Sequence, residues 1–330
     1  MAEIPELSVE EAEELTQEIL AEIQRTVIGK DEFFEEVLLG IIAQGHVLLE
    51  DVPGTGKTLT ANSFANAFGL SFSRIQFTPD LLPNDVTGTN IFNEQDGEFE
   101  FQPGPIFGNI VLADEINRAP PKTQSALLEA MGEKQVTVEG ETRELPEPFF
   151  VIATQNPVEQ EGTFELPEAQ RDRFMIKTSL GYPVVDDEVE LLHRRHDRTT
   201  QTPSAGQVLS GKEQILALQQ VPETIHVDDD LFVYIVELVH ATRQDPRVRV
   251  GVSPRGTQRL FEATKAWAAM NGREYARPED VKRVSQVVLS HRLVLTPEAR
   301  VNDVAKEAVM QDILEEVEVP TVAEEAPAEA

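Results

Sequence analysis

The chain has 330 residues, which suffices for one large domain or two ordinary ones with a buried core. It contains no cysteine, so disulfides, thiolate chemistry and cysteine-ligated zinc are excluded. With 28 basic and 59 acidic residues the net charge is −31, which argues against a nucleic-acid or anionic-membrane binder. The sequence shows neither a signal-peptide pattern nor an apolar run of the about 20 residues that a membrane helix needs, so we expect a cytoplasmic protein without membrane insertion.

The first elements predict a phosphate-binding context. A helix is predicted after Ser8, which forms a capping box with the glutamate three residues later, and it should end near Val27-Ile28-Gly29, with the glycine as the stop signal. A second helix is predicted over Asp31–Gln44. The short buried strand His46–Glu50 then runs into a glycine-bearing loop and a helix over Leu59–Phe68. Strand, glycine loop and helix is the order that a phosphate-binding loop requires.

Short apolar runs then alternate with helical patterns, which indicates an α/β fold with a mostly parallel sheet and helices on both faces. The further predicted strands are Phe72–Phe77, Ile110–Ala113, Phe149–Thr154 and Phe174–Thr178, and a helix is predicted over Pro121–Met131. Two more runs flank Glu139-Gly140 and predict a hairpin, namely Gln135–Val138 and Thr142–Leu145.

A boundary is predicted at Leu180-Gly-Tyr-Pro183, after which the pattern turns helical near 186–195, 210–220, 228–243, 253–270 and 278–290. Ser210 with Glu213 reads as another capping box. We expect a core with its N-terminal helix over residues 1–182, a helical domain over 183–317 and a disordered acidic tail over 318–330.

The loop after the first strand carries the strongest chemical signal. Gly56-Lys57-Thr58 fit the end of the motif G-x-x-x-x-G-K-[ST], although Asp51 stands where its first glycine is expected. Gly54 and Gly56 allow backbone N–H groups to turn inward around an anion, and the following helix adds its positive end. Lys57 is expected to reach the β- and γ-phosphates, and Thr58 to offer its hydroxyl to Mg²⁺. The predicted loop contacts to nucleotide are Pro53, Gly54, Thr55, Gly56, Lys57, Thr58 and Leu59.

The strand Ile110–Ala113 ends in two adjacent carboxylates, where ligands of open α/β sheets gather. Asp114 is expected to hold Mg²⁺, directly or through water, and Glu115 to act as the general base for the attacking water. Neighbouring strand residues point in opposite directions, so this role needs Glu115 to lie past the strand end. Alone, the pair would be an ordinary strand end with solvated acids.

Three further residues are weaker candidates. Asn156 follows a buried strand and could orient water, although an Asn-Pro turn explains it equally well by itself. Arg173 follows a polar helical turn, where an arginine can stabilise phosphoryl transfer or simply pair with Asp172 on the surface. Arg255 falls in the first turn of a helix capped by Ser253; the helix dipole does not favour a cation there, whereas an anionic partner would.

Four segments together resemble the MoxR family of AAA+ ATPases: LLEDVPGTGKT (48–58), ADEINRAPPKTQSALLEAM (113–131), ATQNP (153–157) and LPEAQ (166–170). The resemblance covers nearly the whole chain to about residue 317, and an acidic residue at position 51 is common in that family. It implies an AAA+ P-loop core, an αβα sandwich around a parallel five-stranded sheet of order 5-1-4-3-2, with a smaller all-α lid domain.

The resemblance also implies roles for the candidates. Lys57 and Thr58 would form Walker A, and Asp114 and Glu115 would form Walker B. Asn156 would be sensor 1.

Arg255 would be sensor 2. Arg173 would be the arginine finger given in trans to the next subunit; Arg171 is its rival and stands where the family is expected to have an apolar residue. Ile28 and Gly29 resemble the segment laid against adenine. The strip Asn93–Gln102, with Gly97, matches the position of a hairpin inserted in helix 2 that would line a central pore.

These parallels imply an ATP hydrolase that works with Mg²⁺ in a ring, most simply a hexamer. Its implied activity is chaperone-like remodelling of client proteins with von Willebrand factor A domains. Two alternatives stay open: a motor subunit of a metal-chelatase type, and a nucleotide-gated scaffold with little hydrolysis. His193 and His196 share a helical face without a third ligand nearby in the sequence, so Mg²⁺ is the one metal expected.

The charge also predicts how the protein responds to salt. Lysine is scarce, with nine residues against nineteen arginines, and a lysine-poor, acid-rich chain is typical of halophilic sources. Because salt screens self-repulsion, we expect a higher unfolding temperature in molar KCl than in dilute buffer. Thermal unfolding in the two buffers measures this, and full stability without salt would contradict the halophilic hypothesis.

Overall fold

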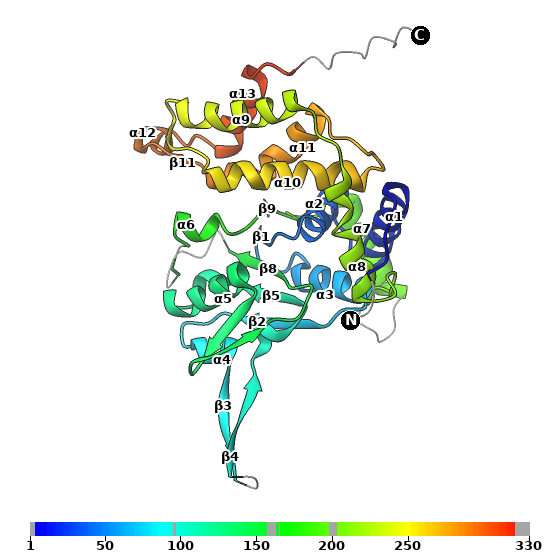
Figure 1. Ribbon diagram of the computed structural model, residues 1–330, viewed down its shortest axis with the longest axis vertical. Helices are drawn as coiled ribbons and strands as arrows, with labels where there is room; N and C mark the ends of the chain where they lie inside the picture. The colour runs from blue at the N-terminus through cyan, green and yellow to red at the C-terminus, as the bar shows by residue number, and fades with distance from the viewer. Residues whose placement is uncertain (1–3, 95–96, 157–162, 165, 198–202, 321–330) are drawn as a thin grey trace.

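The computed structural model describes residues 4–94, 97–156, 163–164, 166–197 and 203–320. At its centre lies a parallel sheet of order β2-β5-β8-β1-β9 (Figure 1). Counted along the chain these are its second, third, fourth, first and fifth strands, so the predicted order 5-1-4-3-2 is confirmed. The strands are β1 (Val47–Glu50), β2 (Phe72–Gln76), β5 (Ile110–Asp114), β8 (Phe150–Gln155) and β9 (Ile176–Thr178).

Helices pack on both faces of this sheet, and a helical layer lies above it in Figure 1. The helices of the first half are α1 (Val9–Thr26), α2 (Asp31–Ile42), α3 (Lys57–Phe68), α4 (Pro83–Thr87), α5 (Pro121–Glu133) and α6 (Glu168–Arg171). Those of the second half are α7 (Val185–Asp197), α8 (Lys212–Leu218), α9 (Asp229–Gln244), α10 (Pro254–Met270), α11 (Pro278–Leu289), α12 (Pro297–Val301) and α13 (Lys306–Glu316). Short 3₁₀ turns are η1 (Pro105–Phe107), η2 (Ile116–Arg118), η3 (Val221–Thr224) and η4 (Ser290–Arg292).

Alternating side chains of the strands enter two separate cores. Val47 and Leu49 of β1 join a large cluster that also contains residues of α1, α2, α3 and the helices of the second half. Leu48 points the other way, into a cluster with β5, β8 and α5. The lid therefore shares its hydrophobic core with one face of the sheet, while α5 covers the other.

The first helix ends where predicted, but for another reason. Val27 leaves the helix in an extended conformation, and its N–H donates to the carbonyl of Ile23. Gly29 is needed for close packing instead, because a Cβ there would lie 2.5 Å from Leu180 Cδ1. Gly29 is therefore required by the close contact between the chain after α1 and the chain after β9.

The capping box predicted at Ser210 and Glu213 was wrong. Gly211 is the N-cap of α8, with φ of 152°, and the side chain of Gln214 folds back to accept from the Ser210 N–H at 2.8 Å. The other predicted helices of the second half are confirmed within a few residues. Not predicted were the strand pair β10 (Val248–Val250) and β11 (Val294–Leu295) and the helices α12 and α13.

The tail beyond residue 320 lies outside the described residues. Across the described part of the chain, none of the helices combines the length and apolarity that crossing a membrane requires.

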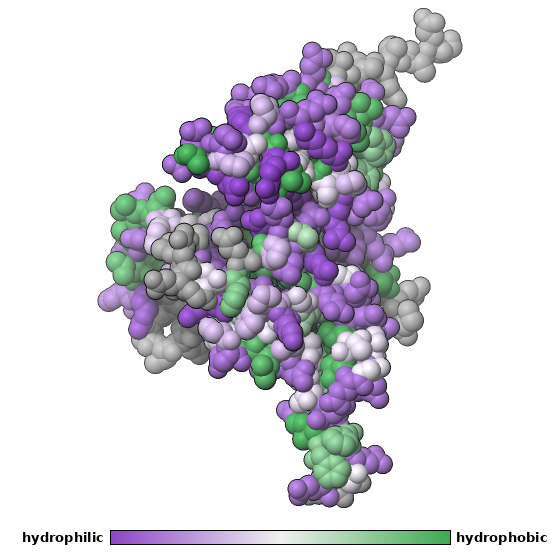
Figure 2. Space-filling view, turned by 90° about the vertical axis from the view of Figure 1, so that its left-hand side faces the viewer, coloured by the Kyte–Doolittle hydropathy of each residue, from purple (hydrophilic) through white to green (hydrophobic). Residues whose placement is uncertain are grey.

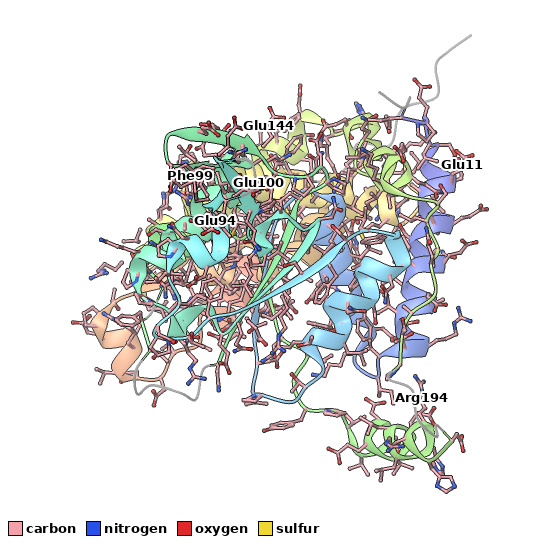
Figure 3. All side chains as sticks on the ribbon, turned by 90° about the horizontal axis from the view of Figure 1, so that it is seen from below. Glu11, Glu94, Phe99, Glu100, Glu144 and Arg194 are labelled. Carbon is pink, nitrogen blue, oxygen red and sulfur yellow. The ribbon has the colours of Figure 1, made fainter. Side chains whose placement is uncertain are left out.

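A long hairpin projects from the core at the end farthest from the lid (Figure 1). It consists of β3 (Gly88–Asn93) and β4 (Glu98–Pro103), so the predicted strip Asn93–Gln102 forms its tip and second strand, apart from residues 95–96, which are not described. Phe92 and Phe99 stack edge to face across the pair, 5.3 Å between ring centres, and both are exposed. Hydrophobic side chains therefore mark this protrusion in Figure 2, and acidic Glu94 and Glu100 lie near Phe99 in Figure 3.

A second hairpin braces the base of the first. It consists of β6 (Gln135–Val138) and β7 (Glu141–Glu144), as predicted. Asn90 donates to Glu139 at 2.8 Å, and the guanidinium of Arg143 lies 3.9 Å from the ring centre of Phe101. The base of the projecting hairpin is thus fixed to the core, while its tip stands free of these contacts.

The side chain of a buried histidine just before β1 contacts both β8 and α5. His46 Nδ1 accepts from the Val151 N–H at 3.1 Å, and Nε2 lies 3.1 Å from the Met131 carbonyl oxygen, so the neutral ring satisfies both partners. Burial lowers the pKa of His46 to about 4. The unfolded chain therefore takes up this proton at a higher pH than the folded one.

This depressed pKa predicts acid sensitivity. The stability that neutral His46 contributes is complete above pH 6.5 and is lost as the pH falls toward 4, by about 1.4 kcal/mol at pH 5.5. His46→Gln should show a correspondingly smaller loss of unfolding free energy between pH 7.5 and 5.5. Urea unfolding at both pH values measures this, with His193→Gln on exposed α7 as the control. Equal losses in wild type and His46→Gln would contradict the prediction.

Candidate functional site

The candidate residues meet because three strands of the sheet are neighbours. β8 lies between β5 and β1, and all three run in parallel. The Asp51 N–H extends this pairing one residue beyond β1, donating to the Gln155 carbonyl at 3.1 Å. The loop after β1, Asn156 after β8 and Asp114 at the end of β5 are thereby placed along one edge of the sheet.

The loop between β1 and α3 has the backbone of an anion-binding nest. Gly54 and Gly56 have φ of 86° and 95°, in the left-handed region, and open space surrounds a Cβ built at either position. Their requirement is therefore conformational rather than steric. Gly56 is the N-cap of α3, and Lys57 and Thr58 form its first turn. The predicted strand, loop and helix arrangement is confirmed.

Lys57 closes this loop on itself. Its Nζ donates to the carbonyls of Asp51 and Val52 at 2.9 and 3.1 Å. Burial lowers the pKa of Lys57, and the charges of Asp51, Asp114 and Glu115 oppose that shift. The ammonium group thus lies within the field of the carboxylates of Asp114 and Glu115 and must exchange its carbonyl partners for any phosphate that it binds.

Asp51 has a role that the sequence motif did not reveal. Its carboxylate is 3% exposed and accepts from Ser179 Oγ, the Leu180 N–H and the Gly181 N–H at 2.7–2.8 Å. These residues follow β9 and lead into α7. The side chain that replaces the expected glycine therefore fastens the phosphate loop to the segment between core and lid.

Thr154 fixes the two Walker B residues relative to one another. Its buried hydroxyl donates to Asp114 Oδ1 at 2.7 Å and accepts from the Glu115 N–H at 2.8 Å. β5 ends at Asp114, and Glu115 has φ of 56°. This left-handed conformation, costly for a residue with a side chain, puts Glu115 past the strand end, as the general-base role requires.

Polar side chains already donate to one carboxylate oxygen each of Asp114 and Glu115. Arg74 of β2 donates to Asp114 Oδ2 through Nε and Nη2, at 3.2 and 2.6 Å. Glu115 Oε2 accepts from Gln76 Nε2 at 3.0 Å and from Arg118 Nη1 at 2.9 Å. These two donors hold Glu115 Oε2, so a water molecule that approaches this oxygen has to displace them.

The donor set fits a hard divalent cation. Asp114 offers a carboxylate and Thr58 a hydroxyl, and oxygen donors of this kind, completed by phosphate and water, suit Mg²⁺. These oxygen donors are therefore compatible with Mg²⁺ at this edge of the sheet. Arg74 pairs with Asp114 Oδ2, so a cation bound at that oxygen has to displace the guanidinium.

A small pocket lies beside the phosphate loop. Ile28, Gly29 and Thr55 form part of its wall, and the chain around Leu180–Pro183 forms another part. The two residues predicted to contact adenine thus face the loop across a concave surface.

The candidate arginines lie in different places. Arg255 is exposed in the first turn of α10, whose N-cap is Ser253, as predicted. Arg173 follows α6 and donates from Nη1 to the carbonyl of Leu128 in α5. Arg171 is half-buried, and its Nε has no hydrogen-bond partner among the described residues. The structure brings Lys57, Asp114 and Glu115 together, whereas Arg173 lies in the segment between α6 and β9 and its guanidinium contacts α5.

The comparisons with known proteins agree with this architecture. Residues 46–176 match the model of the ATPase family associated with various cellular activities (AAA), and residues 240–313 match the AAA lid domain. The chain is 44% identical over 91% of its length to the chaperone MoxR1 of Mycobacterium tuberculosis, of which it covers 81%. The chain belongs to the MoxR family of AAA+ ATPases.

Two further relatives show how far the MoxR likeness extends. The uncharacterized protein YeaC of Bacillus subtilis is 49% identical over 90% of this chain and 92% of its own. A crystal structure from Cytophaga hutchinsonii, solved as that of a candidate ATPase, superposes with a TM-score of 0.88 at 40% identity. It covers 95% of this chain, and 97% of that protein is matched. The likeness therefore includes both the core and the lid.

The contacts of Asp51 predict the effect of restoring the motif's glycine. Asp51→Gly removes three hydrogen bonds and leaves buried N–H groups of the segment after β9 without partners, so we expect a loss of about 2–4 kcal/mol in unfolding free energy. Nucleotide affinity should fall as well. Urea unfolding and nucleotide titration measure the two effects. Glu50→Gln, one residue earlier and paired with Lys177 at the surface, is the matched control; equal effects of both variants would contradict the role of Asp51.

Proposed function

We propose that this MoxR-family protein hydrolyses ATP with Mg²⁺ and uses the reaction to remodel client proteins. The observation that carries the proposal is the meeting of Lys57, Asp114 and Glu115 at one edge of the sheet, with Thr154 fixing the two acids. Each of these groups has a distinct task in phosphoryl transfer, and none is explained by packing alone.

The chain's own residues suggest the course of hydrolysis. Lys57 exchanges the carbonyls of its loop for β- and γ-phosphate oxygens. Thr58 and Asp114 hold Mg²⁺, which when bound neutralises charge on those oxygens. Glu115, released from Gln76 and Arg118, accepts a proton from water as the water oxygen bonds to the γ-phosphorus and the bond to the bridging oxygen breaks. Asn156 is assigned to orienting that water.

The arginine finger of each site comes from the neighbouring subunit. Arg173 lies between α6 and β9 and donates to the Leu128 carbonyl of α5, which is consistent with a residue given to the next subunit in a closed ring. Arg255, exposed at the start of α10, is the lid's contact to phosphate. Ile28 and Gly29 face the adenine. We infer a hexameric ring in which hydrolysis moves the lid against the core.

The client is proposed from family resemblance. Its inferred class is proteins with von Willebrand factor A domains, and the relative named a chaperone is consistent with remodelling. The projecting β3–β4 hairpin, with Phe92 and Phe99 exposed, is the surface assigned to the pore. A chelatase-type motor is less favoured because residues 113–131 match MoxR proteins more closely than chelatase subunits. A non-hydrolysing scaffold would not require the intact Walker and sensor residues.

Steady-state ATP hydrolysis tests the proposal. Wild type in Mg²⁺ and high KCl should show activity per subunit that rises with protein concentration, because the site is completed by a neighbour. Glu115→Gln and Arg173→Ala should each lose about 100-fold or more. Arg249→Ala is the control for Arg173, since it also lies beside α6, through Glu168. No turnover at any concentration, or an Arg173→Ala variant as active as Arg249→Ala, would contradict the shared site.

A further inference from the structure

The segment that carries Arg173 is held by the lid. Between α6 and β9 the chain runs through Asp172, Arg173, Phe174 and Met175, and Arg292 of η4 reaches across from the lid to this segment. The Arg292 side chain is 2% exposed. A fully buried charge is costly unless every donor is satisfied, so Arg292 needs acceptors for all its N–H groups.

All five N–H groups of the Arg292 guanidinium have acceptors. Nε donates to Asp172 Oδ1 at 2.9 Å. Nη2 donates to the carbonyls of Phe174 at 2.8 Å and Asp172 at 3.4 Å, and Nη1 to those of Met175 at 3.2 Å and Val288. Nη1 also lies 2.8 Å from His291 Nε2. Burial lowers the pKa of Arg292 to about 10, opposed by Asp172, so it stays protonated at neutral pH. One lid side chain thus forms hydrogen bonds to the backbone on both sides of Arg173.

The start of α10 holds the same carboxylate. Ser253 Oγ donates to Asp172 Oδ2 at 3.3 Å, while it also caps α10 by accepting from the Gly256 N–H. Arg255, the lid's candidate phosphate contact, lies two residues along the chain. Each carboxylate oxygen of Asp172 therefore accepts from a different element of the lid. Oδ1 accepts from Arg292 of η4, and Oδ2 accepts from Ser253, the N-cap of α10.

Close packing joins these two lid elements to one another. A Cβ at Gly256 would lie 3.0 Å from Arg292 Cδ and 2.3 Å from Val252 Cγ1, so only glycine fits there without a shift. The first turn of α10, which carries Arg255, therefore packs directly against the side chain that holds the segment of Arg173.

We propose that Asp172 is a positioning residue that couples a subunit's own nucleotide state to the arginine finger it gives to its neighbour. Nucleotide that engages Arg255 shifts the first turn of α10, and Ser253 and Arg292 transmit the shift through Asp172 to Arg173. The inference rests on the proposed trans role of Arg173 and adds its regulation: a subunit with ATP presents its finger, and an empty one does not.

Mixing of two variants tests the coupling in assembled protein. Arg173→Ala is the acceptor, which keeps its own site but gives no finger. Glu115→Gln is the donor, which binds ATP and gives Arg173 but does not hydrolyse. The mixture should hydrolyse ATP faster than either alone. Adding Asp172→Asn to the donor should reduce this rescue about tenfold or more, since small misplacement of a catalytic group has effects of that size. Arg292→Lys in the donor should reduce the rescue to a similar extent.

The same substitution in the other partner separates positioning from folding. Asp172→Asn added to the acceptor should reduce the rescue much less than in the donor, because the acceptor has no finger to position and loses only the contact with Ser253 at the start of α10. A donor with Lys57→Ala, which cannot hold ATP, should rescue less than the Glu115→Gln donor. Arg273→Gln, which breaks the lid ion pair with Asp280 away from Asp172, is the control in the donor and should rescue fully.

The outcomes distinguish the coupling through Asp172 from the trans role of Arg173. Full rescue by the Asp172→Asn donor overturns the coupling and leaves the trans finger intact. Equal loss with Asp172→Asn in donor and acceptor also overturns it, because the residue would then serve folding alone. No rescue in the mixture of Arg173→Ala with Glu115→Gln overturns the shared site itself, and the coupling with it.

Discussion

The hydrogen-bonded register of β5, β8 and β1 is the constraint on which the candidate site depends. Parallel neighbours end at the same edge, so residues far apart in sequence arrive together there. Thr154 turns this general property into a specific geometry, because one hydroxyl on the middle strand holds Asp114 and the backbone of Glu115 at once. The left-handed conformation of Glu115 is tolerated because its N–H has this partner. Loss of the register would separate every group assigned to catalysis.

Two carboxylates extend this arrangement beyond the sheet. Asp51 ties the phosphate loop to the segment after β9, and Asp172 ties the finger segment to the lid. Both accept hydrogen bonds from groups far away in the sequence, and both stand next to residues assigned to nucleotide chemistry. The core and lid also share one hydrophobic cluster, so a movement of the lid against the core would repack a contiguous interior rather than swing on a free linker.

Local patterns predicted much of the fold and the centre of the site. Strand, glycine loop and helix gave Lys57 and Thr58 their places, and an apolar strand ending in two acids located Asp114 and Glu115. What the sequence did not disclose were partners at long range. Nothing near Asp51, Thr154 or Arg292 in the chain names the groups that they contact. The capping box at Ser210 was wrong because Gln214 competed for the same backbone N–H.

The β3–β4 hairpin is long enough that a small rotation of the core would displace the hairpin tip much further than its base. Strands of six residues extend about 20 Å from their base. A rigid rotation of the core by about 10° would carry the tip by roughly 3–4 Å, about one residue of extended chain. The brace of Asn90 on Glu139 and of Arg143 on Phe101 stiffens the base and so transmits the rotation instead of absorbing it. The aromatic pair at Phe92 and Phe99 thus lies near the end of a braced arm, where a rotation of the core would produce its largest displacement.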